Sequence, residues 1–223
     1  GLYPMQVAGS LVKTDSSGDF FRVGFLNAGD EIQATLLRPS CSTLTETGTL
    51  LSAQFSGTAM DWGTTAGGLG YEVATNGAYF LHIQAPTGRD LRSQYLLNIT
   101  VADPNMPQIT SVSLPVEGIT DTAVIDRFTV DFTEDMNSAT VSNLANYSLI
   151  SAGPDGVLDT GDDEVYGLSV TYSNGLSASF RITNGPLQAG AYRFALGTGL
   201  TDRALNPLAA PYVRQFAVAW LTD

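Results

Sequence analysis

Apolar and polar residues alternate with a period of two through most of the first half of the chain. The alternation covers residues 20–25, 31–37, 78–83 and 95–101. Because side chains of a strand point to opposite faces in turn, this period predicts half-buried strands, and no helical period is sustained here. The pair Asn76-Gly77, typical of tight hairpin turns, precedes the third run. We therefore expect an antiparallel sandwich or jelly roll.

The second half repeats this class of pattern without repeating the sequence. Residues 137–146 are the exception, and they predict a short helical turn or a connecting loop. Six or seven strands in about 115 residues is the number found in immunoglobulin-like sandwiches. The expected strands lie at residues 109–114, 128–132, 168–172, 178–183, 191–196 and 215–220.

A proline-flanked segment divides the two halves. Ala102–Pro107 carries prolines at 104 and 107, which block both a helix and a central strand, and alternating runs lie on each side. We expect domains at 1–104 and 105–223, joined by a short and semi-rigid linker. The predicted fold class is all-β, with two tandem antiparallel β-sandwiches, jelly-roll-like and then immunoglobulin-like.

The composition excludes several classes of function. Hydrophobic residues make up 43% of the 223 residues, enough for a core in each half, so intrinsic disorder is excluded. A net charge of -12 argues against nucleic-acid binding, and no apolar run is long enough to span a membrane. Cys41 is the only cysteine, which excludes an internal disulfide framework. The first residues carry no initiator Met and no signal core, so we expect any targeting signal to lie outside this sequence.

Four segments of the first half carry a family resemblance. Residues 18–23, 28–32, 77–83 and 95–99 place alternating strands around fixed glycines. This pattern resembles the bacterial pre-peptidase C-terminal domain family over residues 9–102. The resemblance implies a β-sandwich appended to a secreted protease or glycosidase.

The second half resembles another family, and its motifs are more specific. Over residues 107–219 the chain is similar to the bacterial Ig-like modules, of planctomycete type, found in large exported proteins. Leu205 stands where these modules usually have glycine, so a different turn is expected there. Both resemblances imply non-catalytic accessory modules and a secreted or cell-surface location. The segments that carry the second resemblance are residues 132–137, 146–149, 153–156, 160–163, 187–192 and 199–208.

Catalytic chemistry has little support in the sequence. His82 is the only histidine, and it lies in an alternating strand with no nucleophile-elbow serine in the chain to complete a triad. A zinc site needs several His or Cys ligands, whereas the chain has one residue of each type. We therefore assign no catalytic residue. Any two acids could meet in space as a glycosidase pair, but nothing favours a particular pair.

An acidic segment at Asp155–Glu164 predicts a metal site. It holds five acids in ten residues, interrupted by Gly156 and Gly161. Calcium prefers six to eight oxygen ligands on a loop that can curl, so we expect Ca²⁺ to be a cofactor here. The spacing is not that of an EF-hand, and the alternative is a solvated hairpin. The expected side-chain ligands are Asp155, Asp159, Asp162 and Asp163.

A glycine-rich segment at residues 60–71 is a candidate for sugar binding. An exposed Trp62 or Tyr71 on a sandwich can stack on a sugar ring, and Asp61 can bond its hydroxyls. The alternative is a tryptophan folded over the end of the sandwich. The segment has neither the lysine nor the following helix of a phosphate-binding loop.

Three functions compete on this basis. The leading hypothesis is a non-catalytic binding or spacer module pair within a larger secreted or cell-surface bacterial protein, where it contacts neighbouring domains and an extracellular polymer or glycan. The second is a carbohydrate-binding module of a polysaccharide-degrading enzyme. The third is a free-standing β-sandwich enzyme that cleaves polysaccharides. A groove with converging acids would favour the enzyme, and an exposed aromatic plane would favour sugar binding.

Overall fold

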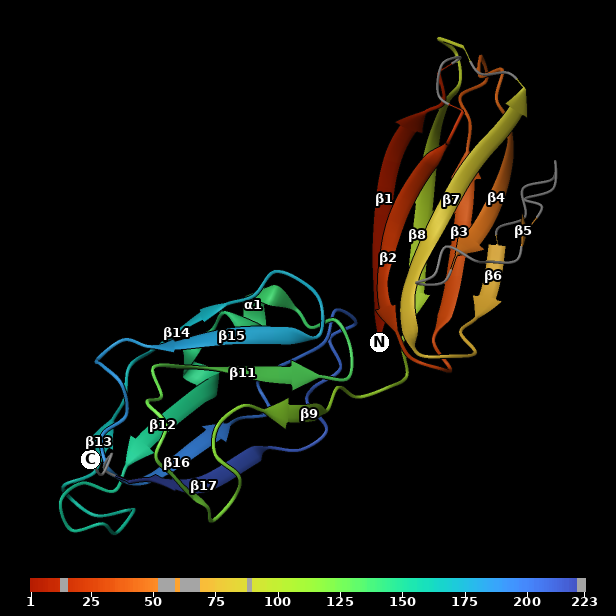
Figure 1. The fold of residues 1–223 in the computed structure, drawn as a ribbon. Coiled ribbons are helices and arrows are strands. Elements are labelled where there is room, and N and C mark those ends of the chain that lie inside the picture. The colour runs from red at the N-terminus through yellow and green to blue at the C-terminus, as the bar shows by residue number, and fades with distance from the viewer. Residues whose placement is uncertain (13–15, 52–58, 61–68, 88–89, 220–223) are drawn as a thin grey trace. The chain divides into compact units, whose positions relative to one another are not determined.

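The chain folds into two compact units whose regular secondary structure is almost entirely β-strand (Figure 1). The units are Gly1–Asn105 and Met106–Asp223, so their boundary falls within the proline-flanked segment. Both are β-sandwiches whose described strand pairs are antiparallel, apart from one short parallel pair in the second unit. The computed structural model describes residues 1–12, 16–51, 59–60, 69–87 and 90–219.

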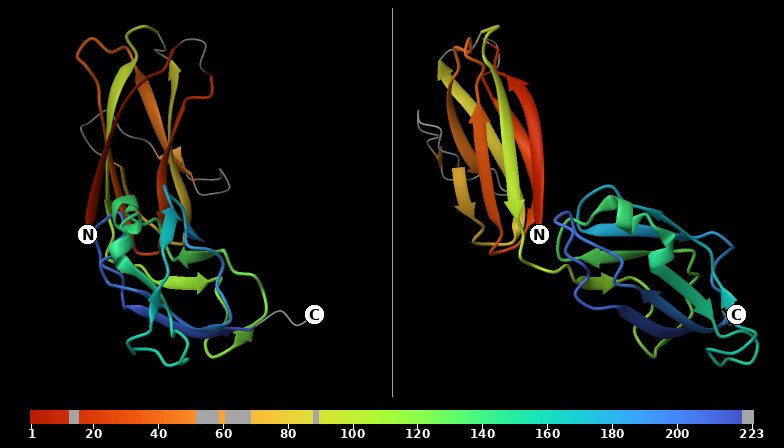
Figure 2. Two further views of the ribbon diagram at one scale, coloured as in Figure 1. Left: turned by 90° about the vertical axis from the view of Figure 1, so that its left-hand side faces the viewer. Right: turned by 180° about the vertical axis from the view of Figure 1, so that it is seen from behind.

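Two antiparallel four-stranded sheets form the described part of the first unit (Figure 2). The order in one sheet is β1 (Leu2–Ser10), β8 (Gln94–Ala102), β3 (Glu31–Leu37) and β6 (Leu69–Glu72). The order in the other is β2 (Asp19–Leu26), β7 (Gly77–Thr87), β4 (Thr45–Leu51) and β5 (Ala59–Met60).

The core of the first unit follows from the alternation in the sequence. In β8 every second residue from Tyr95 to Val101 is buried, and Leu81 and Ile83 of β7 are buried in the other sheet. Each such side chain contributes about 1.5–3 kcal/mol through removal of its apolar surface from water. Pro4 is tolerated because β1 is an edge strand, where one side needs no ladder hydrogen bonds.

The pair Asn76-Gly77 does not form the hairpin turn that it predicts. It joins β6 to β7, which belong to different sheets, so the chain crosses the sandwich here. The Asn76 side chain instead accepts a hydrogen bond of 2.9 Å from the Ala28 N–H, and the Gly29 N–H donates to the Val73 carbonyl. The connection from β2 to β3 and the connection from β6 to β7 are therefore held together by hydrogen bonds. This tertiary contact overrides the local turn preference of Asn76-Gly77.

Residues 106–219 of the second unit form a sandwich of five and four strands. In the five-stranded sheet the order is β10 (Thr120–Asp121), β17 (Tyr212–Val218), β16 (Gly190–Leu196), β12 (Tyr147–Ser151) and β13 (Glu164–Val165), with β10 parallel to β17. In the four-stranded sheet the order is β14 (Leu168–Thr171), β15 (Ser177–Ile182), β11 (Arg127–Phe132) and β9 (Ile109–Val112).

Two short helical segments connect β11 to β12, within the stretch where a helical turn or loop is predicted. They are α1 (Ser138–Val141) and the 3-10 turn η1 (Leu144–Asn146). Asn137 and Asn143 cap them, because each side-chain oxygen accepts a backbone N–H two residues later. None of the helices in the described residues is long and apolar enough to cross a membrane.

Aromatic rings fill the centre of the second sandwich. Phe128 of β11 stacks on Phe180 of β15 with ring centroids 5.0 Å apart, and Phe194 of β16 meets Phe128 edge-on at 5.0 Å. All three are buried. Such contacts add about 0.5–1.5 kcal/mol each beyond the burial of area, so both sheets are joined by directional as well as apolar contacts.

Candidate functional site

The acidic segment forms the loop of a hairpin. Strands β12 and β13 pair antiparallel, with Ser151 opposite Glu164, and the segment Asp155–Asp163 lies between them. Gly153 and Gly156 adopt positive φ angles of 62° and 72°, which glycine allows at little cost. The loop is therefore curled back on itself.

Hydrogen bonds within the loop engage several of its carboxylate oxygens. Asp162 accepts the Asp155 N–H at 3.1 Å and the Thr160 hydroxyl at 2.6 Å, and these bonds lower the pKa of Asp162. Asp155 accepts the Val157 N–H at 2.8 Å. Asp155 and Asp162 thus lie together on one side of the loop.

Asp159 is held by an arginine. Both of its oxygens accept from Arg193 of β16, at 2.8 and 2.6 Å, and this bond lowers the pKa of the carboxyl. Asp163 accepts the Asp159 N–H at 2.8 Å, whereas its other oxygen, Oδ1, is buried and accepts no hydrogen bond. The four predicted ligands therefore fall into two groups, and Arg193 relieves part of the repulsion that a cation was expected to relieve.

The candidate sugar-binding residues lie mostly outside the described part of the chain. Asp61 and Trp62 fall there. Tyr71 lies in β6, half-buried, with its ring 6.2 Å from that of Tyr79. Partial burial raises the pKa of Tyr71. This tyrosine packs against the sandwich.

His82 occupies a structural position in β7. Its Nε2 atom lies 2.6 Å from the Ser17 carbonyl oxygen, and its ring stacks on Phe20 with centroids 4.0 Å apart and planes 6° apart. The Ser17 carbonyl thus contacts the edge of the imidazole, and the Phe20 ring covers one of its faces. Cys41, the single thiol, is exposed.

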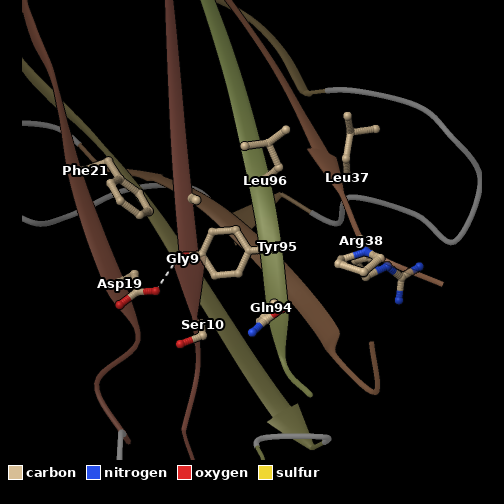
Figure 3. A pocket seen from close by; sticks show the side chains of 11 residues that line it. Gly9, Ser10, Asp19, Phe21, Leu37, Arg38, Gln94, Tyr95 and Leu96 are labelled. Atoms are coloured by element: carbon tan, nitrogen blue, oxygen red, sulfur yellow. Dashed lines mark hydrogen bonds between the residues drawn. The ribbon is translucent and has the colours of Figure 1, made fainter. Parts of the chain in front are cut away.

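A cavity of about 750 Å³ opens at the edge of the first sandwich (Figure 3). Tyr95 of β8 lies in it and donates a short hydrogen bond to Asp19 of β2. Gly9 of β1 contacts the Tyr95 ring so closely that a Cβ atom would collide with it. Polar and apolar side chains share the wall, with Arg38 and Leu37 on the opposite side from Asp19.

Two carboxyl groups are buried near each other in the first unit. Asp30 accepts the Asn27 N–H at 2.9 Å and the Asn105 amide at 2.8 Å. Burial raises the pKa of Asp30 to about 6, and the charge of Asp103, together with a hydrogen bond that protonated Asp30 donates to it, adds to the rise. Only 1% of Asp30 is exposed. In the sequence, the position of Asp30 directly after the turn residues Ala28-Gly29 was the available sign of a structural role. The alternation pattern does not identify a charged residue next to a turn as buried.

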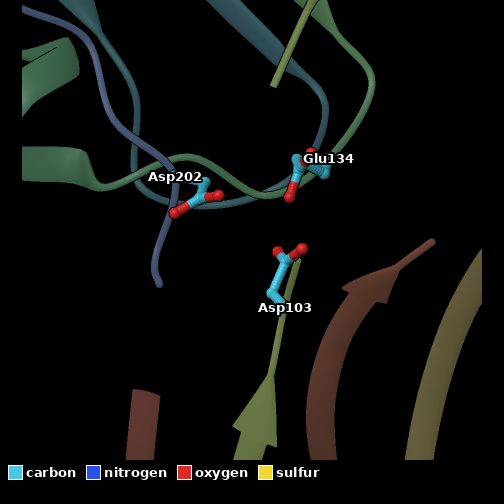
Figure 4. Close-up of side chains that lie close together, drawn as sticks. All are labelled: Asp103, Glu134 and Asp202. Carbon is cyan, nitrogen blue, oxygen red and sulfur yellow. The ribbon is translucent and has the colours of Figure 1, made fainter. Parts of the chain in front are cut away.

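The second unit also buries acids, which organise its loops. Glu134 follows β11 and Asp202 lies in the connection after β16 (Figure 4). Asp202 accepts the Asn206 backbone N–H at 2.9 Å and the Asn206 amide at 2.8 Å. This turn places Leu205 at a φ of 68°, the left-handed region usually taken by glycine. Leu205 therefore adopts a backbone conformation that glycine takes at lower cost.

Asp135 ties two further loops together. Its Oδ1 accepts the Gly175 N–H at 2.8 Å, and its Oδ2 lies 3.8 Å from Arg203. Only 4% of Asp135 is exposed. This acid, like Asp202, falls in a segment that carries the second-half resemblance, and its contacts are those of a structural residue.

A known family matches the second half of the chain. The model of the bacterial Ig-like domain matches residues 103–218, just over half of the sequence. The chain belongs to the bacterial Ig-like domain family. This membership accounts for the two-sheet sandwich of the second unit. Among curated proteins this Ig-like chain has no significant match.

Solved structures similar to this Ig-like chain show low identity. The N-terminal part of the bacterial S-layer protein SbsC is 22% identical over 51% of this chain and 24% of that one, with a TM-score of 0.36. PcoC, a methionine-rich copper resistance protein from Escherichia coli, is 15% identical over 52% of this chain and 100% of that one, at 0.39. Two fibronectin type III domains of chicken tenascin are 12% identical over 90% and 98%, at 0.27.

Proposed function

We propose that the chain is a non-catalytic pair of accessory modules that spaces or binds within a larger secreted or cell-surface bacterial protein. Membership of the bacterial Ig-like domain family carries this proposal. The bonding of the candidate chemical groups supports it, because His82, Asp135 and Asp202 all serve loops or strands. The neighbouring domains of the host protein are the first partners that we expect.

The first unit is proposed to be a module of the pre-peptidase C-terminal type. Its two four-stranded antiparallel sheets are compatible with such an appended sandwich. The segments of the resemblance fall on β2, β3, β7 and β8, which form the centre of the two sheets and one edge.

The spacer function is tested by replacement in the host protein. Deletion of residues 1–223 should impair the host, whereas replacement by an unrelated pair of β-sandwiches of equal length should restore its surface display and activity. Failure of the unrelated pair to restore function would contradict a spacer and favour a specific binding surface.

We also propose that the acidic loop binds Ca²⁺. The ion would draw together Asp155 and Asp162 of one group and Asp163 of the other, which would supply carboxylate oxygens. The loop would supply carbonyl oxygens, while Asp159 stays with Arg193. The buried Oδ1 of Asp163, which accepts no hydrogen bond, supports this proposal. Ca²⁺ at a hundredfold over its dissociation constant would add about 2.7 kcal/mol to the stability of the second unit.

Thermal unfolding with and without Ca²⁺ tests the calcium proposal. Asp155→Asn with Asp162→Asn keeps oxygen acceptors but removes two charges, and it should abolish the calcium-dependent rise in Tm. Asp121→Asn is the matched control, because Asp121 accepts the N–H of Ala123 just as Asp155 accepts that of Val157. Superimposable melting curves in chelator and in excess Ca²⁺ would contradict the calcium proposal and show that the loop is a solvated hairpin.

Sugar binding by the first unit is the second candidate, and its cavity of about 750 Å³ favours it. Asp19, Arg38 and Gln94 provide hydrogen-bonding groups there beside the apolar Leu37 and Leu96. Affinity electrophoresis on neutral polysaccharides tests it. Retardation that is lost in Gln94→Ala would support the cavity, loss in Trp62→Ala would support the glycine-rich segment, and no retardation would contradict both.

A further inference from the structure

The second unit has few cations, and most of them are engaged. Residues 106–223 contain five arginines and no lysine. Arg193 and Arg203 lie against carboxylates, and Arg214 donates to the backbone carbonyls of residues 112 and 114. The other two arginines are Arg127, which pairs with its neighbour Asp126, and Arg181, and both lie on the same sheet.

Arg127 of β11 lies directly opposite Arg181 of β15 in the antiparallel register. The Ile182 N–H donates to the Asp126 carbonyl, so residues 127 and 181 form a non-hydrogen-bonded pair, the type whose side chains are closest. Like charges directly opposite each other destabilise a sheet. Because this pair of opposed arginines costs stability in an otherwise acidic unit, a binding function would account for its presence.

One carboxylate faces these two cations. Asp126 binds Arg127 through two hydrogen bonds of 3.0 Å at an exposed position. Arg181 interacts electrostatically with Asp126, but its guanidinium donates no hydrogen bond within residues 106–219. Arg127, Arg181 and Asp126 together keep one net positive charge, and the five N–H donors of Arg181 remain available to a ligand.

Hydroxyl groups surround the two arginines. A shallow depression of about 560 Å³ is lined by residues of β11, β14 and β15 and by Ser113, which follows β9. Its polar residues alternate along the strands with the buried Phe128 and Phe180 of the core. The hydroxyls can both donate to and accept from a polyol, and Arg can bind an oxyanion through two parallel bonds. The hydroxyl residues in its wall are Ser113, Thr129, Ser169, Thr171 and Ser179.

We propose that this arginine–hydroxyl face, Arg127 and Arg181 with those five hydroxyl residues, binds the oxyanion groups of an acidic polysaccharide. Asp126 precedes Arg127, and Asp131 lies on the same face of β11 about 13 Å further along. Asp126 and Asp131, at the two ends of this face, leave room between them for one oxyanion flanked by sugar hydroxyls. A polymer with closely spaced phosphates is disfavoured because these two acids would repel it. This inference is independent of the proposed spacer function and of the cavity in the first unit.

The net charge of -12 does not prevent such binding. At about 0.1 M salt the Debye length is about 10 Å, so the acids far from the face are largely screened. The two opposed arginines act at contact distance and are screened less. The affinity for the polysaccharide should therefore fall as the salt concentration rises above about 0.1 M, but binding should still be measurable at that concentration.

Binding of the intact chain to soluble polymers tests the proposal in 0.1 M NaCl. The probes are polygalacturonate, dextran sulfate, neutral dextran and polyglutamate, measured by affinity electrophoresis and calorimetry. We expect binding to polygalacturonate or to dextran sulfate but not to dextran. Whichever polymer binds identifies the oxyanion as carboxylate or sulfate. Binding to neither overturns the proposal, as does binding to polyglutamate alone, which would assign the face to an acidic protein.

Substitutions locate the binding. Arg127→Gln with Arg181→Gln should weaken it at least about tenfold, because hydrogen bonds to charged groups are lost. Arg92→Gln, at an exposed turn of the first unit, is the charge-matched control for the single variant Arg181→Gln and should leave the affinity unchanged. Equal loss in the control, or no loss in Arg181→Gln, would overturn the assignment. The Tm of Arg181→Gln without polymer should be unchanged or higher, since the like-charge pair is removed.

Discussion

The buried Asp30 makes the stability of the first unit depend on pH in an unusual direction. Its pKa is about 6 in the folded chain against an ordinary value of 3.8. Below pH 4 both the folded and the unfolded chain keep the proton, so the group contributes nothing. Between pH 4 and 6 the folded chain still holds the proton that the unfolded chain has released, and stability therefore falls as pH rises. Above pH 6 the full cost is present.

The size of this cost follows from the difference in pKa. A shift from 3.8 to about 6 corresponds to about 3 kcal/mol, a large fraction of the stability of a small domain. Asp90 has a lowered pKa and contributes in the opposite direction, so the useful quantity is the difference between wild type and Asp30→Asn. That variant cannot titrate at this position.

The assay is urea unfolding between pH 4 and pH 8, followed by fluorescence in a Trp220→Phe background that leaves Trp62 as the only tryptophan. The amide introduced by Asp30→Asn has a single oxygen and cannot accept from both Asn27 and Asn105 as the two carboxyl oxygens do, so the variant should be the less stable protein at pH 4. Its disadvantage should shrink by about 3 kcal/mol by pH 7. A difference that stays constant across this range would refute the reasoning.

Three other predictions concern the fold. Leu205→Gly should raise the stability of the second unit by about 0.5–1 kcal/mol, measured by thermal unfolding, because relief of the left-handed conformation exceeds the entropy cost of glycine at a residue that is 65% exposed. Gly9→Ala should destabilise the first unit by about 1–3 kcal/mol in urea unfolding, since the Cβ atom meets the Tyr95 ring; an unchanged midpoint would contradict this contact. Residues 1–103 and 105–223, produced separately, should each unfold cooperatively, and loss of both transitions would contradict independent cores.

Strands with a clear two-residue period were predictable, and those without it were not. Segments such as 31–37 and 95–101 match β3 and β8 closely because burial on one face requires the alternation. The strand β1 was missed because Pro4 argues against a strand until its edge position is known. Short strands such as β10 and β13 carry too few residues to show a period.

The candidate sites were predictable only as far as local sequence determines them. The curled acidic loop at residues 155–163 follows from its glycines and acids. The pairing of Asp159 with Arg193 does not, because these residues are 34 positions apart and meet only through the sheet. The opposition of Arg127 and Arg181 likewise depends on strand register, which the sequence pattern leaves open.

The most direct test of the non-catalytic proposal is a turnover measurement on the intact chain. Purified protein, with and without Ca²⁺, is incubated with a panel of polysaccharides and a protein substrate, and the release of reducing ends and of new amino groups is followed. The account predicts background rates that are the same for wild type and His82→Ala. Turnover that disappears in His82→Ala, or on substitution of a single acid such as Asp19, would contradict it.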